Sequence, residues 1–221
     1  MNTKLSIALV AYAMSLSVSA QAATVNIDLS GATTGAQINA PGGSFAQTFA
    51  GQSVVGGNGI SGSPTGPLSL APSGSIMVAF WDPGVSPASN SLLSQPDNAA
   101  PLSILFDSLA DSLTFTMGSA EAGSTVKVVS FAANGSVLGS TQITMLSGYN
   151  IYNLNGLGNF KGLTFFDNND SSGVRYQNFS YNSVVGGGVP EPAAWAMMLA
   201  GFGMVGAAMR RRSQSARITF A

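Results

Sequence analysis

The chain has 221 residues, of which only 8% are charged, and it contains neither cysteine nor histidine. That composition excludes disulfides, thiol catalysis, a Ser-His-Asp triad and the usual zinc sites. The net charge of -1 conceals an uneven distribution, because residues 23–189 carry eight acidic and only three basic side chains. Such a segment repels phosphate, so nucleic acid is excluded as a partner.

The N-terminus has the features of a secretory signal peptide, in the expected order. A positive start ends at Lys4, an apolar stretch occupies 5–18, and Ala20-Gln21-Ala22 supplies the small-x-small cleavage pattern. We expect cleavage directly after Ala22, with Ala20 and Ala22 as the residues that the peptidase recognises. The apolar stretch is too short for a comfortable transmembrane span, which argues against a permanent anchor. Residues 1–22 are therefore predicted to export the chain.

Residues 23–185 are predicted to form an all-β body. Short alternating or apolar stretches recur between turn residues, without a sustained helical period. The dipeptide Asn134-Gly135 separates two such stretches and is a strong hairpin signal. The expected strands are 24–29, 75–81, 112–117, 125–132, 136–143, 161–166 and 175–181. Residues 31–70 and 83–101 are interpreted as loop-rich, with one or two strands in the first. This spacing favours an antiparallel β-sandwich.

One expected strand also specifies which side chains face the core. In 112–117 the alternation places Leu113, Phe115 and Met117 on one face. We expect these three to point inward. Thr114 and Thr116 are expected to face solvent, since successive side chains of a strand point to opposite faces.

Few residues of this body suggest a ligand site. Asp167, Asn169 and Asp170 lie in an oxygen-rich loop and are candidate Ca²⁺ ligands, although an ordinary polar turn explains the same residues. Trp81 and Asp82, at the end of an expected strand, are candidates for stacking on a sugar ring, with a core tryptophan followed by a turn as the alternative. Apart from that Ca²⁺ candidate no cofactor is predicted. No catalytic residue is predicted either, because no motif pairs two carboxyl groups.

The C-terminus combines a glycine-rich linker, a proline-rich motif, an apolar segment and a basic end. The linker and motif occupy 186–192, and the 17 residues of 193–209 carry no charge. At 1.5 Å per residue that segment spans about 25 Å as a helix, near the lower limit for crossing a bilayer. The basic residues that follow should stay in the cytoplasm under the positive-inside rule. We therefore predict a single transmembrane helix over 193–209 and a cytoplasmic tail over 210–221.

This arrangement resembles the PEP-CTERM sorting signal of Gram-negative bacteria, of the PEPxxWA type. The resemblance lies in the motif residues Pro190, Glu191, Pro192, Trp195 and Ala196 and in the stop-transfer arginines Arg210, Arg211 and Arg212. It implies recognition by an exosortase, a sorting enzyme embedded in the inner membrane, and processing near the Pro-Glu-Pro motif. Release or transfer to the cell surface would follow, and such proteins often accompany exopolysaccharide. The tail after Arg212 is longer than is usual in the family.

The second half of the body resembles the jelly-roll ectodomains that often precede this signal. The residues that carry the resemblance lie in 111–115, 133–140 and 176–181. It implies a galactose-binding-like sandwich and leaves the ligand open. The sequence thus favours a non-enzymatic, exported surface or extracellular-matrix protein, with carbohydrate binding as a candidate activity. A secreted polysaccharide hydrolase and a self-associating structural matrix component are the alternatives.

Overall fold

The computed structural model describes residues 22–81, 89–95, 99–119, 122–169, 173–184, 198–199 and 201–205. The chain divides into two compact units. One is Ala22–Gly186, which we call the body, and the other combines Met1–Gln21 with Gly187–Ala221. All strands and both apolar clusters of the described residues belong to the body.

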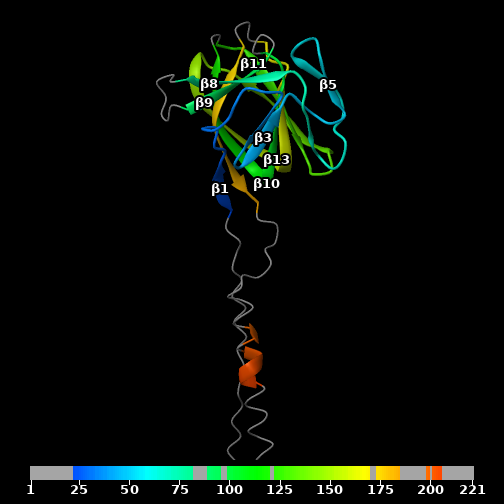
Figure 1. Ribbon diagram of the computed structural model, residues 1–221, viewed down its shortest axis with the longest axis vertical. Helices are drawn as coiled ribbons and strands as arrows, with labels where there is room; N and C mark the ends of the chain where they lie inside the picture. Colours follow the sequence, from blue (N-terminus) through cyan, green and yellow to red (C-terminus); the bar gives the residue numbers. More distant parts are fainter. Residues whose placement is uncertain are drawn as a thin grey trace, which may run out of the picture. The chain divides into compact units, whose positions relative to one another are not determined.

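The body is an all-β sandwich, which confirms the predicted fold class (Figure 1). Its first seven strands are short: β1 (Ala23–Asn26), β2 (Gln37–Ala40), β3 (Gly43–Ala46), β4 (Thr48–Phe49), β5 (Gln52–Val55), β6 (Gly59–Gly62) and β7 (Leu70–Ala71). The others are longer: β8 (Ser75–Trp81), β9 (Ser89–Gln95), β10 (Leu102–Ser119), β11 (Thr125–Phe131), β12 (Val137–Thr144), β13 (Gly148–Phe166) and β14 (Arg175–Ser183).

The two longest strands, β10 and β13, take part in both layers of the sandwich. Near the start of β10, Ile104 pairs with Phe45 of β3. Towards its end, Leu113 pairs with Tyr181 of β14. One layer therefore has the order β2-β3-β10-β13-β11-β12, and the other has the order β13-β10-β14-β9-β8, with β1 also on β14. Strands that pass from one layer to the next form the corners of a sandwich.

The core between the layers is rich in aromatic rings. Phe45 of β3 contacts Phe179 of β14, with ring centroids 5.2 Å apart. Phe106 of β10 lies edge-on to Tyr181 of β14 at 4.8 Å. Tilted and edge-on pairs of this kind are favourable beyond the area that they bury. The rings therefore hold β3, β10 and β14 in fixed relative positions.

A register shift changes which face of β10 points into the core. Buried side chains occupy even positions first and odd positions later: Ile104, Phe106 and Ala110, then Leu113, Phe115 and Met117. The pairing of β10 with β13 is irregular between these two sets, and a one-residue slip turns a strand over. The predicted inward direction of the second set is confirmed. Thr116, expected to face solvent, is only 3% exposed and lies opposite the buried Gln177 of β14.

Residues 47–71 cover the outer face of the layer that contains β11. Phe49 and Leu68 pack there on Phe131 in a second apolar cluster, and the β5–β6 hairpin lies on the flank of the body opposite β8 and β9 (Figure 1). The prediction for 31–70, a loop with one or two strands, contained too few strands, because β2 to β6 all lie within it. Elements of two to four residues are too short for alternation to show.

Residues 102–111, the first part of β10, had no expected strand, and two further stretches also escaped the sequence analysis. β9 lies inside the predicted loop over 83–101, and 148–160, the first part of β13, had no expected strand. Both stretches mix serine, asparagine and glycine with isolated apolar residues, so their period of two is weak. The predicted strands 75–81, 125–132, 136–143 and 175–181 agree with β8, β11, β12 and β14 to within two residues at each end.

The C-terminal unit is described only in part. Residues 198–199 and 201–205 are helical and fall within the predicted transmembrane segment 193–209. Among the described residues, no helix is long and apolar enough to cross a membrane. The predicted signal peptide lies outside the described residues, except for the exposed Ala22.

Candidate functional site

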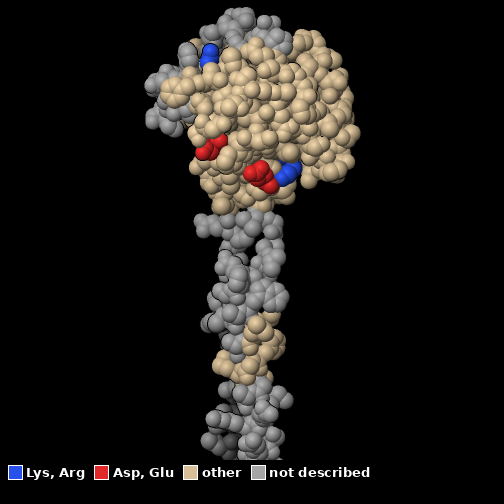
Figure 2. Space-filling view, in the orientation of Figure 1, with Lys and Arg blue, Asp and Glu red and all other residues tan. Residues whose placement is uncertain are grey.

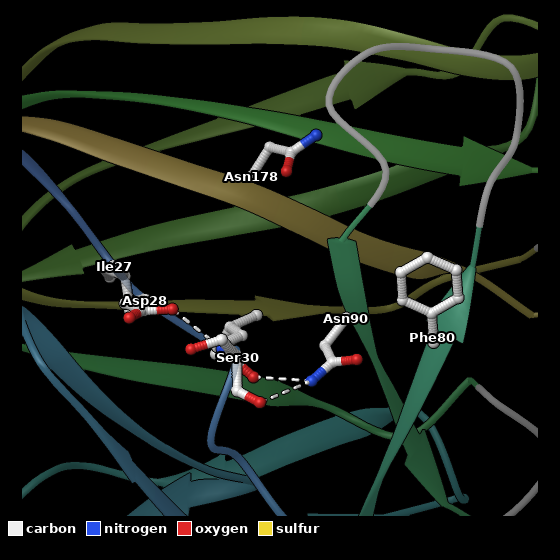
Figure 3. Close-up of a pocket in the computed structure, with 7 residues that line it drawn as sticks. Ile27, Asp28, Ser30, Phe80, Asn90 and Asn178 are labelled. Carbon is white, nitrogen blue, oxygen red and sulfur yellow. Dashed lines mark hydrogen bonds between the residues drawn. The ribbon is translucent and has the colours of Figure 1, made fainter.

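A groove lies beside β14, where its two neighbours on one edge approach each other (Figure 3). β1 pairs with β14 from Ser180 to Ser183, whereas β9 pairs with it at Tyr176. The groove lies between these pairings and has a volume of ≈ 330 Å³. Its lining comes from four parts of the chain: Ile27, Asp28, Leu29, Ser30, Phe80, Asn90 and Asn178.

Asn178 marks an irregularity in β14 that creates the groove. Its backbone is left-handed, with φ of 54°, a conformation that asparagine tolerates better than most residues. The buried side chains of β14 change there from Tyr176 to Phe179 and Tyr181, so the strand turns over by one residue. Beyond the irregularity, the Ile27 amide donates to the Phe179 carbonyl at 2.9 Å. This bond holds the segment after β1 against β14.

The segment that follows β1 presents a carboxylate to the groove. Ile27 and Leu29 are buried in the core, whereas Asp28 and Ser30 are exposed. The Ser30 amide donates a hydrogen bond to Asp28 Oδ1 at 2.9 Å. Bonding to the backbone amide of Ser30, and then to its side chain, lowers the pKa of Asp28 below its ordinary value. Asp28 is therefore an anion at neutral pH, in a tight turn of the kind that aspartate favours.

The opposite wall of the groove is aromatic and amide in character. Phe80 of β8 pairs with Asn90 of β9, so both side chains lie on the same face of the hairpin. Asn90 Nδ2 donates to the Leu29 carbonyl at 2.7 Å and joins the two walls (Figure 3). Phe80 is 69% exposed, the most exposed aromatic side chain among the described residues. An apolar ring beside a few polar groups in a concave site is a usual composition for the binding of a small ligand.

The chemistry of the groove is that of a polar, weakly charged binding site. It offers one aromatic face, one carboxylate, one hydroxyl and two amide side chains. Among the described residues that line it, none has a basic side chain. Charged side chains are sparse and scattered over the visible face of the body (Figure 2).

Neither predicted sugar-stacking residue is among the described residues that line the groove. Trp81 is the last residue of β8, but its side chain and the whole of Asp82 lie outside the described residues. Phe80, its neighbour, lines the groove instead. Sequence analysis did not identify Phe80, Asp28, Asn90 or Asn178. The Asp28-Leu29-Ser30 turn was a local signal for one of them, but the others come together only through strand pairing.

The predicted Ca²⁺ loop serves as a turn that ties two strands together. Asn169 Oδ1 accepts the Thr125 amide at 2.6 Å, and the Asn169 amide donates to the Thr125 carbonyl at 3.3 Å. The Asp167 amide donates to the Asn58 carbonyl at 2.8 Å. Asp170 lies outside the described residues, among which no cluster of three acidic, histidine or cysteine side chains is found. In the described part of this loop, the side-chain oxygen of Asn169 is therefore already bonded to a backbone amide.

The predicted sorting residues cannot be placed in the same way. Pro190, Glu191, Pro192, Trp195 and Ala196 lie outside the described residues, as do Ala20 and the three stop-transfer arginines. Their assignment depends on sequence alone.

Comparison with solved structures yields distant neighbours. A variant of a family 29 carbohydrate-binding module complexed with mannohexaose is 12% identical over 73% of this chain and 92% of its own, with a TM-score of 0.37. Another variant of that module is 14% identical over 48% of this chain and 74% of its own, with a TM-score of 0.31. An Arthrobacter globiformis isomalto-dextranase complexed with panose is 11% identical over 73% of this chain and 32% of its own, with a TM-score of 0.29. At such low scores the likeness says nothing about the ligand of this chain.

Comparison with protein sequences is informative at the C-terminus. None of the curated proteins matches the chain. The family model described as the PEP-CTERM protein-sorting motif matches residues 188–212. These residues contain the Pro-Glu-Pro motif, the apolar segment and the arginine cluster. Residues 188–212 of this chain are therefore a PEP-CTERM protein-sorting motif.

Proposed function

We propose that this chain is an exported surface protein, delivered by an exosortase-type enzyme, whose body binds carbohydrate in the groove between β1 and β9. The sorting motif at 188–212 supports the delivery. The exposed ring of Phe80, in the same groove as Asp28 and Asn90, is the observation that carries the binding. The proposed ligand is an exopolysaccharide of the cell surface or of the extracellular matrix.

Sugars suit this groove because they are amphipathic in a particular way. A pyranose ring has apolar C–H faces and a rim of hydroxyl groups. An exposed aromatic ring covers a C–H face, while carboxylate and amide groups bond the hydroxyls. A few placed polar groups beside an apolar surface are the usual composition of a small-ligand site.

The groove favours binding over hydrolysis. Glycoside hydrolysis uses two carboxyl groups, one of which must hold a proton near neutral pH. Among the described residues of the lining, Asp28 is the one acidic residue, and its pKa is lowered rather than raised. An ionised carboxylate accepts hydrogen bonds from sugar hydroxyls but does not protonate a leaving group.

The body is proposed to act after both terminal segments are processed. The domains would be the signal peptide 1–22, the ectodomain 23–185, the linker and motif 186–192, the membrane helix 193–209 and the cytoplasmic tail. The pairing of Ala23 with Ser183 supports these boundaries, since the first expected cut directly precedes β1 and the second follows the end of β14. The helix would anchor the exported body in the inner membrane until processing, before its transfer to the surface.

Binding is tested with full-length protein in detergent against a panel of neutral and acidic polysaccharides by affinity electrophoresis and calorimetry. Phe80→Ala should weaken binding at least tenfold, because it removes the stacking surface. Ile151→Ala is the matched control, since Ile151 is 64% exposed and does not line the groove. Equal affinity of wild type and Phe80→Ala for every bound glycan would place binding elsewhere.

Delivery is tested by the intact mass of the protein from its native host, in membrane and extracellular fractions. A mass that begins at Ala23 and ends near Pro190 to Pro192 supports processing at both ends. A mass that retains Arg210 would mean a permanent anchor and would refute sorting by cleavage.

Self-association is a second candidate function, favoured by β12. This strand ends the sheet order, carries no charged residue or proline, and exposes Val137 by 62%. Such an edge lacks the usual protection against pairing with another strand. Sedimentation over a wide concentration range tests it, and Thr141→Lys should abolish any assembly through this edge.

A further inference from the structure

We propose that the groove selects uncharged polysaccharides and discriminates against polyanionic ones such as uronate polymers. This inference rests on the proposed carbohydrate binding and specifies the class of sugar. Among the described residues that line the groove, Asp28 is the one ionisable group. Recognition of a sugar carboxylate ordinarily uses arginine or lysine, and neither lines this groove.

The position of Asp28 lets its charge act directly on a ligand in the groove. The side chain is exposed, and the bond from the Ser30 amide at 2.9 Å fixes its orientation. A carboxylate offers about four lone-pair sites, so the contact with Ser30 leaves capacity for sugar hydroxyls. A hydroxyl that donates to a carboxylate makes a charge-assisted bond, which is stronger than a neutral one. A second carboxylate in the same place brings two acceptors of like charge together.

The rest of the groove does not offset this charge. Ser30, Asn90 and Asn178 are neutral hydrogen-bonding residues, and Phe80 presents a ring face, whose quadrupole is negative. The wider body also carries an excess of acidic residues, eight against three basic ones over 23–189. A polyanion is therefore repelled at contact and, at low salt, at distances up to the Debye length.

The experiment compares matched hexasaccharide pairs that differ in oxidation at C6: glucose with glucuronate, mannose with mannuronate, and galactose with galacturonate. Affinities are measured by calorimetry with full-length protein in non-ionic detergent at low salt and at 0.5 M NaCl. In each pair that binds, the affinity for the neutral member at low salt should exceed the affinity for the uronate by a factor of about five or more. The preference should shrink at high salt, because exposed charges are screened.

Two variants separate the charge from the rest of the site. Asp28→Asn keeps a side-chain oxygen for the Ser30 amide and should reduce the ratio within each pair to near one. Asp28→Ser is a second variant that can form the same turn. Phe80→Ala should weaken both members of a pair by a similar factor.

The outcomes distinguish this inference from the proposed function. Uronate binding as tight as neutral binding, lost in Phe80→Ala, overturns the selectivity and leaves carbohydrate binding intact. A neutral preference that is unchanged in Asp28→Asn also overturns it. Absence of binding to all six sugars overturns the carbohydrate proposal itself, and this inference with it.

Discussion

The hydroxyl of Tyr181 donates a hydrogen bond of 3.1 Å to the carbonyl of Gly42, which lies 139 positions earlier in the sequence. Gly42 stands in the turn between β2 and β3, with φ of 93°, and its amide donates to Asp107 Oδ2 at 3.0 Å. Both backbone groups of this residue are therefore held by side chains of the long strands. A side chain at Gly42 would come within 3.0 Å of the Asn26 carbonyl at the end of β1. The turn thus joins β1, β10 and β14 at one end of the body.

Removal of that hydroxyl should destabilise the body without changing its fold. The ring of Tyr181 is 1% exposed, and Tyr181→Phe removes one of two donors to the Gly42 carbonyl, which also accepts the Asp107 amide at 3.2 Å. We expect a loss of about 0.5–1.5 kcal/mol in the free energy of unfolding by urea, the net value of one hydrogen bond. Tyr152→Phe is the control, because the Tyr152 hydroxyl accepts the Leu146 amide at the surface. A loss of less than about 0.5 kcal/mol is expected there, and equal losses would contradict the special role of Tyr181.

Two buried glutamines should respond in opposite ways to the same substitution. Gln177 is fully buried, and neither polar atom of its side chain has a hydrogen-bond partner. An unsatisfied buried amide costs about 1–3 kcal/mol, and methionine has a similar shape without that cost. Gln177→Met should therefore raise the free energy of unfolding by about that amount at unchanged urea m-value.

Gln47 is the matched case with the opposite expectation. Its Nε2 donates to the carbonyls of Ser75 and Gln95 and to Ser94 Oγ at 3.2 Å, which joins the end of β3 to β8 and β9. Gln47→Met should lower the free energy of unfolding by about 1–3 kcal/mol, because it leaves those acceptors without their donor. Destabilisation by both substitutions would show that the Gln177 amide is satisfied in solution.

The groove should keep its charge down to mildly acidic pH. Hydrogen bonds from Ser30 lower the pKa of Asp28, and an unfolded aspartate titrates at about 3.9. The stabilising effect of the ionised turn is therefore present above about pH 4 and is lost as the pH falls through the lowered value. Affinity for a neutral glycan should be constant from about pH 7 to 5. The Ser30 amide resonance should titrate below about pH 3.9 and not at all in Asp28→Asn; a midpoint above that value would contradict the assigned bond.

Calcium should not change the stability of the body. The Asn169 side chain uses Oδ1 to accept the Thr125 amide, so that oxygen is already engaged in holding the turn. We expect the same Tm in millimolar Ca²⁺ and in chelator, and a loss of about 1 kcal/mol in Asn169→Ala under both conditions. A rise of Tm with Ca²⁺ that disappears in Asp167→Asn would restore the metal site.

The hairpin formed by β11 and β12 shows what local sequence determines here. Asn134-Gly135 supplies the turn, with φ of 84° at Gly135, and Asn134 Oδ1 accepts the Ser136 amide at 3.0 Å. These bonds form between neighbours in sequence, so turn chemistry alone placed both strands to within one residue. The sorting motif was equally accessible, since its residues are contiguous.

The groove could not be predicted in that way. Phe80 and Trp81 are adjacent in a stretch that is apolar on both faces, so alternation does not indicate which ring is exposed. Asp28 and Asn178 line the same groove because β14 turns over between its pairings with β9 and β1, a relation that depends on three distant segments. The short strands of 47–71 were missed for a similar reason, because their partners and their cluster around Phe131 are supplied by the tertiary structure.

The position of β14 has a mechanical consequence. The strand ends at Ser183, where the chain leaves the body towards the sorting tail, and Asn178 on the same strand lines the groove. As long as the proposed membrane helix still holds the body, a pull on a polymer bound at Asn178 would run along β14 to its end at Ser183, within this one strand. Because β10 and β1 pair antiparallel with this strand, the pull slides neighbouring strands past one another and loads many backbone bonds at the same time. Strands loaded in shear separate at a higher force than strands that unzip one hydrogen bond at a time.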